Sequence, residues 1–149
     1  MQKIKESEIL YHRLTLVVAP PRAGKTSALQ EVAAETGAPI VNVNLELSRR
    51  MLDLTEQQRA LQLPRLLDEI IAEANSDVVL LDNTEILFDV QLRQDPLRLL
   101  QGSSRNHSVV FAWSGIVEGD HVVYAEPGHP EYQRYPISGY LVVSPEISA

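Results

Sequence analysis

Two observations predict that the chain adopts an α/β fold with a mostly parallel β-sheet. Short runs of β-branched and aliphatic residues recur along the 149-residue sequence, each about long enough for one strand. Between them lie segments whose apolar residues repeat at helical spacing. Strands that alternate with helices favour parallel pairing and right-handed crossovers. The length fits a single domain over residues 1–149, large enough to bury a hydrophobic core.

The first half of the chain predicts two strands with a helix between them. Residues 13–19 (RLTLVVA) form a β-branched run typical of a buried strand. Residues 25–37 repeat small and aliphatic side chains on one face and end at Gly37, where a helix C-terminal cap belongs. Residues 39–45 predict the second strand, because aliphatic residues alternate with asparagines there: Val41, Asn42, Val43, Asn44 and Leu45.

Two helices are predicted before the third strand. Thr55 and Gln58 have the spacing of a capping box, which predicts a helix over 55–62. Pro64 is expected to start or kink the next helix. The apolar stripe of that helix consists of Leu63, Leu66, Leu67, Ile70, Ile71 and Ala74.

The third and fourth strands follow in the second half. Residues 77–82 (DVVLLD) contain a continuous apolar run, so a strand there would be apolar on both faces. This implies that both faces of the sheet are covered. A short helix over 96–102 leads to the fourth strand at 108–113. Gly115 and Gly119 are expected to bracket a turn.

The last part of the chain predicts three short elements. After the turn, residues 121–126 (HVVYAE) indicate a hairpin or a short extra strand. Residues 130–135 indicate one or two helical turns, and 139–144 (GYLVVS) indicate the last strand.

Composition narrows the classes of function. The chain contains no cysteine, which excludes disulfides and thiolate metal sites. No apolar run approaches the roughly 18 residues of a membrane helix, and the first ten residues lack the apolar core of a signal peptide, so we expect a cytoplasmic protein with no membrane partner. The net charge of −7 disfavours direct DNA binding by the isolated chain, because phosphate neutralisation supplies most non-specific affinity.

The segment 19–26 (APPRAGKT) matches the phosphate-binding loop pattern, with Ala19 in the first glycine position. Such a loop turns backbone N–H groups toward an anion, and the following helix adds its unpaired N–H groups and positive dipole end. Lys25 would reach the β and γ phosphates of ATP, and the Thr26 hydroxyl would ligate Mg²⁺. The predicted nucleotide-binding residues are Pro21, Arg22, Ala23, Gly24, Lys25, Thr26 and Ser27.

A carboxylate at the end of the third strand is the second signal. Asp82 ends an apolar strand and would emerge at the carboxyl edge of the sheet, where open α/β sheets bind their ligands. Beside the phosphate loop, it would hold Mg²⁺ through water. Thr26 and Asp82 are therefore the predicted metal residues.

The residue that activates water is less sharply defined. Many hydrolytic members of this fold have glutamate directly after the aspartate, whereas here Asn83 can orient water without accepting its proton. Glu85 could bend back to the site. The alternative role for Glu85 is that of an N-terminal helix residue whose negative charge complements the helix dipole. Glu46, after the second strand, is another candidate, and we favour Glu85. The predicted catalytic residues are Glu85, Asn83 and Lys25.

Other polar residues have two interpretations each. Ser114 ends the fourth strand, where it could sense the γ-phosphate or form part of a turn. Arg49 and Arg50 could contact the γ-phosphate, although surface ion pairs are the favoured interpretation. Arg105 precedes the fourth strand and would reach a nucleotide only across a subunit interface.

Four segments carry a resemblance that spans essentially the whole chain: LVVAPPRAGKT (16–26), VNVNLELSRRMLDL (41–54), LLDNTEILF (80–88) and VVYAEPGHPEYQRY (122–135). They resemble the BrxF family of small P-loop proteins from type 3 bacteriophage-exclusion (BREX) systems. The resemblance implies a three-layer P-loop NTPase core related to AAA+ ATPases, with strand order 5-1-4-3-2. It also implies an ATP-binding protein that acts with a methyltransferase, an alkaline-phosphatase-like protein, a helicase and a larger ATPase.

The resemblance also assigns residues. By motif, nucleotide binding falls on Gly24, Lys25 and Thr26, and magnesium binding falls on Asp82. The departures are Ala19, discussed above, and Asn83, which leaves hydrolysis open. The sequence ends without the C-terminal helical lid of full AAA+ proteins, so an arginine acting from another subunit is not guaranteed.

Three functions follow from these observations. The first is an ATPase or ATP-dependent switch in a multiprotein phage-defence complex. The alternative is a nucleotide-binding scaffold with little or no hydrolysis, which Asn83 favours. A small-molecule kinase is the third function. Such kinases usually close an arginine-bearing lid over the phosphates, and the only arginine-rich stretch after Asp82 is QLRQDPLRLL (91–100), so this function is the least favoured. The choice between ATP and GTP, the partner and a nucleotide-dependent homo-oligomer stay open.

Overall fold

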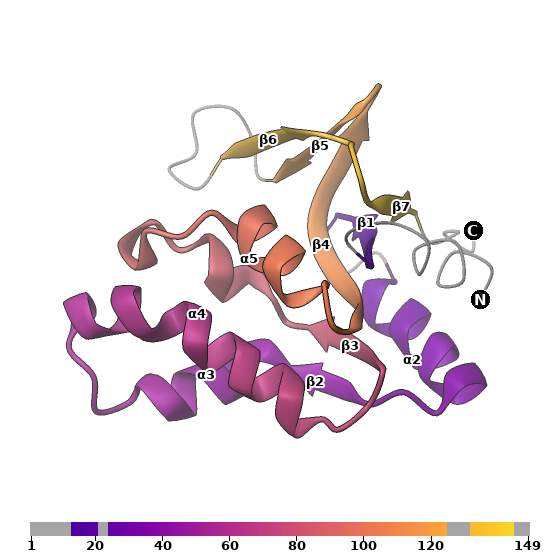
Figure 1. Ribbon diagram of the computed structural model, residues 1–149. Coiled ribbons are helices and arrows are strands. Elements are labelled where there is room, and N and C mark those ends of the chain that lie inside the picture. The colour runs from indigo at the N-terminus through magenta and orange to yellow at the C-terminus, as the bar shows by residue number, and fades with distance from the viewer. Residues whose placement is uncertain (1–12, 21–23, 125–131, 145–149) are drawn as a thin grey trace.

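The structure is a computed structural model that describes residues 13–20, 24–124 and 132–144. A sheet lies at its centre, and the main row of strands has the order β2-β3-β4-β1-β7 (Figure 1). Every neighbouring pair in this row is parallel. The strands of the row are β1 (Leu14–Ala19), β2 (Ile40–Asn42), β3 (Val78–Asp82), β4 (Ser108–Glu118) and β7 (Leu141–Val143).

This strand order confirms the fold prediction. The last strand, β7, returns to pair with β1, and β4 lies on the other side of β1. Counted along the chain, the five parallel strands therefore have the order 5-1-4-3-2. Two further strands, β5 (His121–Tyr124) and β6 (Gln133–Pro136), extend β4 as an antiparallel ribbon.

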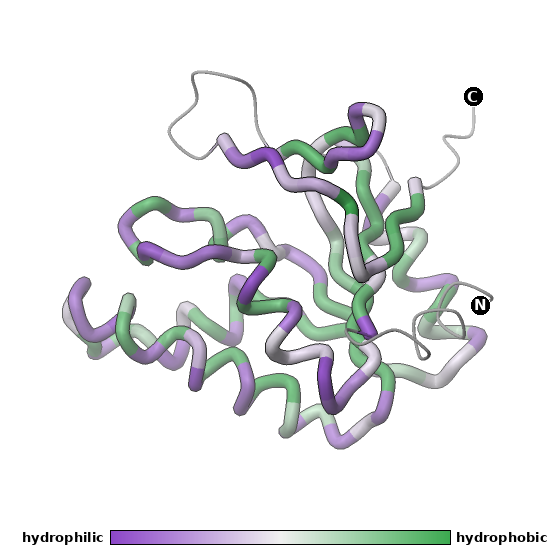
Figure 2. Tube along the Cα trace, turned by 45° about the horizontal axis from the view of Figure 1, so that its top comes forward, coloured by the Kyte–Doolittle hydropathy of each residue, from purple (hydrophilic) through white to green (hydrophobic). Residues whose placement is uncertain are grey.

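Helices cover both faces of the sheet. On one face lies α2 (Lys25–Thr36), and on the other lie α3 (Val43–Met51), α4 (Glu56–Glu73) and α5 (Pro96–Ser103) (Figure 1). In β3, Val79 and Leu81 join the core under α3–α5, whereas Leu80 joins the smaller core under α2. The predicted cover on both faces of this strand is therefore confirmed. Figure 2 shows hydrophobic residues running along the central strands.

The second strand is shorter than predicted. It ends at Asn42, whose side-chain oxygen accepts a hydrogen bond from the backbone N–H of Leu45 at 3.0 Å and so caps α3. Val43 belongs to that helix, where it is buried together with Leu47 and Met51 at every fourth position. Leu45 is 51% exposed. The predicted strand over 43–45 is wrong because the helical period, and not the alternation, matches the core.

A single helix, α4, replaces the two predicted around Pro64. The capping box of Thr55 and Gln58 is present at its N-terminus, as predicted. Proline has no N–H group, so Pro64 leaves the backbone carbonyl of Ala60 without its helical donor. The side-chain amide of Gln94 donates to that carbonyl at 2.6 Å, which satisfies it and lets the helix continue.

The hairpin after the fourth strand is confirmed, but it begins later than predicted. β4 continues without interruption past Gly115 to Glu118, and the turn lies at Gly119 and Asp120. Gly115 is required for a different reason: a Cβ atom there would lie 1.8 Å from the backbone oxygen of Val123 in β5. The glycine therefore permits close approach of the two strands.

The predicted helical turns over 130–135 are wrong where the structure describes them. Gln133–Pro136 form β6, which pairs antiparallel with β5. The ring of Tyr135 packs edge-on against Trp113, with ring centroids 5.8 Å apart. Strand pairing and this aromatic contact decide the conformation.

Among the helices of the described ranges, none combines the length and the apolarity that crossing a bilayer requires.

Candidate functional site

The candidate site lies at the carboxyl edge of the parallel sheet, where neighbouring strands end side by side. Ala19, at the end of β1, is in register with Ser114 of β4. Asn42, at the end of β2, is in register with Asp82 of β3. Parallel pairing thus brings the ends of β1, β2 and β3 together with Ser114 of β4 at one edge of the parallel row, although these residues are far apart in the sequence.

The loop after β1 leads directly into α2. Gly24 precedes the helix with φ of 93°, a left-handed conformation that favours glycine, and no side chain caps the helix there. The amide of Ala28 already bonds to the Gly24 carbonyl at 3.0 Å. The amides of Lys25, Thr26 and Ser27 lie in the first turn, where helix N–H groups have no intrahelical partner. The predicted residues Pro21, Arg22 and Ala23 lie outside the described residues.

Lys25 is a buried cation at the start of α2, with 8% of its surface exposed. Its ammonium group donates to the backbone oxygens of Ala19 at 3.2 Å and Pro20 at 3.0 Å. Burial lowers the pKa of Lys25, and the negative charges of Glu85 and Asp82 act against that shift. The lysine is thus held against the loop by neutral acceptors, with both predicted carboxylates near enough to influence it.

Thr26 and Asp82 meet directly. The Thr26 hydroxyl donates to Oδ2 of Asp82 at 2.9 Å, although 56 positions separate them in the sequence. The second oxygen of Asp82, Oδ1, accepts from the backbone N–H of Asn83 at 2.9 Å. Asp82 is 8% exposed. The two predicted metal residues therefore lie together, and both present hard oxygen donors.

The segment after Asp82 turns sharply. Asn83 has φ of 51°, a left-handed conformation in which asparagine is enriched, and its carbonyl accepts from the amide of Asn44 at 3.0 Å. Thr84 is 1% exposed, and its hydroxyl donates to the backbone oxygen of Ala112 in β4. The turn therefore directs the chain back toward β4.

This turn brings Glu85 to Ser114 of β4. Glu85 begins the short 3₁₀ helix η1 (Glu85–Phe88), and its Oε1 accepts from the hydroxyl of Ser114 at 2.7 Å. With Asn44, Asn83, Ile86 and Asp89, it also lines an open hollow of about 560 Å³. The predicted catalytic residues Asn83 and Glu85 thus lie beside one another at the edge that carries Lys25.

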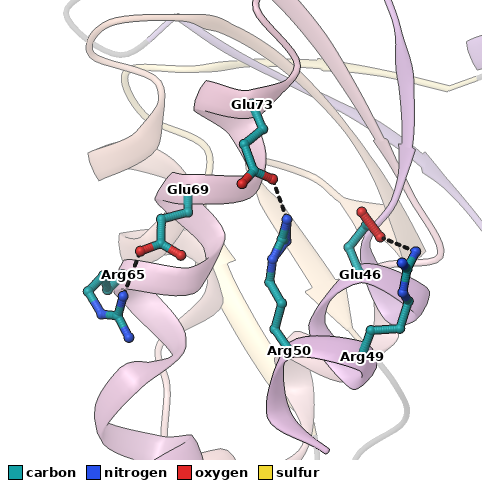
Figure 3. A network of polar contacts seen from close by, with 6 residues as sticks. All are labelled: Glu46, Arg49, Arg50, Arg65, Glu69 and Glu73. Atoms are coloured by element: carbon teal, nitrogen blue, oxygen red, sulfur yellow. Dashed lines mark hydrogen bonds and ion pairs between the residues drawn. The ribbon is translucent and has the colours of Figure 1, made fainter.

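The remaining predicted candidates do not join this group. Glu46 lies in the first turn of α3 and pairs with Arg49 at 3.3 Å. Arg50 pairs with Glu73 of α4 (Figure 3). Both arginines therefore make the surface ion pairs that the sequence favoured. Arg105 lies in the turn before β4, at the opposite end of that strand from Ser114.

Sequence reasoning missed two residues at this edge. The sequence pattern places Asn44 in a strand, whereas its backbone N–H donates to the backbone oxygen of Asn83 and so supports the turn there. Thr84 was not considered, and its buried hydroxyl fixes the same turn to β4. The available signal for Thr84 was the run of polar residues 82–84 directly after an apolar strand, whereas Asn44 lies between Val43 and Leu45 and has no such signal.

Comparison with known protein families decides the broader identity. Residues 15–109 match the family described as "ATPase family associated with various cellular activities (AAA)". The match spans well over half of the chain and contains both the phosphate loop and Asp82. The chain belongs to the AAA family. Searches of curated proteins and of solved structures gave no match.

Membership of the AAA family agrees with the fold and with the arrangement of the loop. Proteins of this family have a P-loop NTPase core, so the chain is a nucleotide-binding protein of the ATPase class, and such cores typically use Mg²⁺. The matched region ends at the second residue of β4. Ser114, the β5–β6 ribbon and β7 lie beyond it, so their contribution rests on geometry alone.

Proposed function

We propose that the chain binds Mg·ATP at the carboxyl edge of its sheet and hydrolyses it as a component of a phage-defence complex. The observation that carries the proposal is the 2.9 Å contact between Thr26 and Asp82. The fold joins a hydroxyl from the first turn of α2 and a carboxylate from the end of β3, directly beside the buried ammonium group of Lys25. This combination suits a triphosphate with its metal ion.

The donor set supports magnesium. Mg²⁺ prefers oxygen ligands and usually takes one or two from protein, with water and phosphate completing its octahedron. Thr26 and Asp82 offer one hydroxyl and one carboxylate, which matches this sparse protein contribution. Within the described ranges, no group of three or more His, Asp or Glu residues forms a dedicated metal cage. When bound, the ion would neutralise charge on the β and γ phosphates.

The chain's own residues would divide the work of hydrolysis. Lys25 would exchange its bonds to the loop carbonyls for the phosphates, and the first amides of α2 would donate to the same oxygens. Glu85 would accept a proton from the attacking water. The water oxygen would bond to the γ-phosphorus as the bond from that phosphorus to the β–γ bridging oxygen breaks and ADP leaves. Ser114 holds Oε1 of Glu85 by a 2.7 Å hydrogen bond. Asn83 would orient the water through its amide.

The test compares binding and turnover in four proteins: wild type, Lys25→Ala, Glu85→Gln and Glu46→Gln. Affinity for Mg·ATP should fall sharply in Lys25→Ala only. Glu85→Gln should lower kcat by about 10²–10⁴-fold with binding retained, because it removes a general base. Glu46→Gln is the matched control, since Glu46 pairs with Arg49 on the surface, and it should behave as wild type. Equal turnover in Glu85→Gln and wild type would contradict the catalytic assignment.

A nucleotide-binding scaffold with little hydrolysis is the second candidate. Asn83 occupies the position next to Asp82, and Glu85 is already engaged by Ser114, which favours this alternative. The two candidates differ in one measurement, the wild-type turnover rate with partners present. Partners must be included because an arginine supplied from another subunit can raise the rate about 10³–10⁵-fold.

The defence role rests on the resemblance to the BrxF family. We propose that the partners are the methyltransferase, phosphatase-like protein, helicase and larger ATPase of such a system. Co-purification of the tagged chain with each partner, with and without a non-hydrolysable ATP analogue, tests this. We expect capture that depends on nucleotide and is lost in Lys25→Ala. No capture of any of the four in either condition would overturn the assignment.

A further inference from the structure

Glu85 is one end of a short helix whose other end is buried in aromatic rings. The helix η1 contains Glu85 at its first position and Phe88 at its last. A 3₁₀ helix has three residues per turn, so side chains three positions apart project in the same direction. Both residues contact β4, at consecutive positions of that strand: Glu85 contacts Ser114, and Phe88 contacts Trp113.

Phe88 is held on two sides. Its ring stacks on Tyr124 of β5, with centroids 3.6 Å apart and planes 5° from parallel. It also meets Trp113 edge-on, with centroids 4.9 Å apart and planes at 88°. All three residues are buried, at 5%, 7% and 0% exposure for Phe88, Tyr124 and Trp113 respectively. One stacked and one edge-on ring contact leave η1 little freedom to rotate about its own axis.

Of the two partners of Phe88, Tyr124 belongs to the β-ribbon, which we define as residues 115–118 of β4 with β5 and β6, and Trp113 precedes it in β4. Figure 1 shows β4 continuing beyond the parallel row into this ribbon. The indole N–H of Trp113 donates to the backbone oxygen of Val123 at 3.2 Å, and the missing Cβ of Gly115 makes room for that oxygen. The position of Tyr124 is therefore fixed relative to the end of β4.

We propose that Phe88 is a positioning residue for Glu85, and that the β-ribbon sets the rate of ATP hydrolysis by holding Phe88. The aromatic contacts fix the rotation of η1, and that rotation holds Glu85 at Ser114, on the wall of the open hollow that it lines together with Asn83. This inference rests on the proposed function, since it assumes that Glu85 activates water. Phe88 itself belongs to the hydrophobic core under α3–α5.

The test starts from Phe88→Leu, which keeps an apolar side chain and removes the ring. We expect kcat for ATP to fall about 10–100-fold, since a displacement of about 1 Å at a catalytic group costs on the order of 10²-fold. The Kd for a non-hydrolysable ATP analogue should stay within about twofold, because the phosphate loop is unchanged. Assays use the full chain with Mg²⁺ and any partner needed for turnover.

Two control variants separate positioning from general destabilisation. Phe111→Leu changes the other phenylalanine of the chain, which is buried in the same core and meets Trp113 but lies outside η1. It should destabilise the protein and leave kcat within about twofold at a temperature where it is folded. Tyr124→Phe keeps the ring against which Phe88 stacks, and should also retain kcat.

A double-mutant cycle gives the sharpest outcome. If Phe88 acts through Glu85, Phe88→Leu should produce no further loss of kcat in a Glu85→Gln background. Hydrogen exchange of the η1 amides provides a readout that needs no turnover: they should exchange faster in Phe88→Leu, while those of α2 should not. Additive losses of kcat, or unchanged η1 exchange, would overturn the proposal.

The same data distinguish this failure from a failure of the proposed function. If Lys25→Ala binds Mg·ATP as well as wild type does, the nucleotide site is wrong, and the positioning role falls with it. If Lys25→Ala loses binding and Glu85→Gln loses turnover while Phe88→Leu turns over normally, only the positioning role is wrong.

Discussion

The two layers that cover the sheet are stabilised in different ways. In the α2 layer, only Lys25 and Leu29 of the helix are buried, and small partly buried residues make up most of the remaining contact. In the opposite layer, α4 alone buries five aliphatic residues: Leu63, Leu66, Leu67, Ile70 and Ile71. Apolar burial contributes roughly 1.5–3 kcal/mol per large aliphatic side chain, so the α3–α5 layer carries much more of the stability.

This difference separates two tasks. The α2 layer begins at the phosphate loop, with a glycine and no side-chain cap at its N-terminus. An anion bound there would supply the missing hydrogen-bond acceptors, so nucleotide should stabilise this layer most. The α3–α5 layer has its caps and core in place without any ligand. The following predictions test whether stability and nucleotide response divide between the layers in this way.

The largest effect is expected in the α3–α5 core. Leu67→Ala removes a fully buried side chain and should lower the free energy of unfolding by about 2–5 kcal/mol. Its affinity for Mg·ATP should match wild type, because α4 does not contribute to the phosphate loop. Urea unfolding and calorimetric titration measure the two quantities. Leu29→Ala, on α2, is the matched comparison and should lower both stability and affinity; equal affinity losses in the two variants would contradict the division.

Nucleotide-linked stabilisation should be next in size. At a ligand concentration of 100 times Kd, Mg·ATP should stabilise the wild type by about 2.7 kcal/mol, and Lys25→Ala should lose this gain. Hydrogen exchange should show increased protection in α2 and η1 upon binding. Protection that increased equally in the middle of α4 would indicate that the two layers respond as one.

A smaller effect is expected at the N-terminus of α4. Thr55 accepts a hydrogen bond from the amide of Gln58 at 3.2 Å, and the Gln58 side chain accepts one from the Thr55 amide at 2.9 Å. Thr55→Ala should lower stability by about 1 kcal/mol, as loss of a capping residue does. Chemical denaturation measures it, and the exposed Ser48→Ala in α3 provides a control near zero. Nucleotide affinity should be unaffected in both.

The smallest effect concerns how the free energy of unfolding depends on pH. It should be absent at neutral pH, appear in alkaline solution, and have opposite signs in the two layers. Burial raises the pKa of Tyr140, which joins the α3–α5 core, to about 12. The native state then holds a proton that the unfolded state releases above about pH 10, so stability should fall as pH rises from 10 to 12. Tyr140→Phe should flatten this fall. Unfolding measured across this pH range checks the slope.

Lys25 should act in the opposite direction. Its pKa is lowered by burial, so just below pH 10.5 the unfolded state holds a proton that the native state has released. Stability should therefore rise with pH in that window, and the rise should be absent in Lys25→Ala. A falling contribution from Lys25 would mean that the ammonium group gains more from Glu85 and Asp82 than it loses by burial.

The sequence predicted which polar residues lie close together better than it predicted the elements around them. Lys25, Thr26, Asp82 and Glu85 were all chosen from local motifs, and the fold brings them to one edge. Their contacts with each other follow from parallel strands ending together, which the element order already implied. The assignment of their chemical roles stays a prediction that the experiments above address.

Errors occurred where two local patterns competed. Residues 41–45 alternate as a strand, but Val43, Leu47 and Met51 also repeat as a helix, and only the position of the core selects between them. Pro64 breaks helices locally, yet Gln94, thirty positions away, satisfies the carbonyl that it frees. Neither outcome could be read from a short window, because each depends on a distant partner.

By itself, the sequence determined the class of the fold, and it predicted a phosphate loop and a carboxylate beside that loop. These follow from residue types at fixed spacing and from backbone geometry that any chain of this pattern shares. Only the tertiary structure decided how Glu85 is held, because Ser114 and the rings of Trp113 and Tyr124 reach η1 from β4 and β5. Side chains that meet across strands leave no periodic trace in the sequence, so their contacts appear only when the chain is folded.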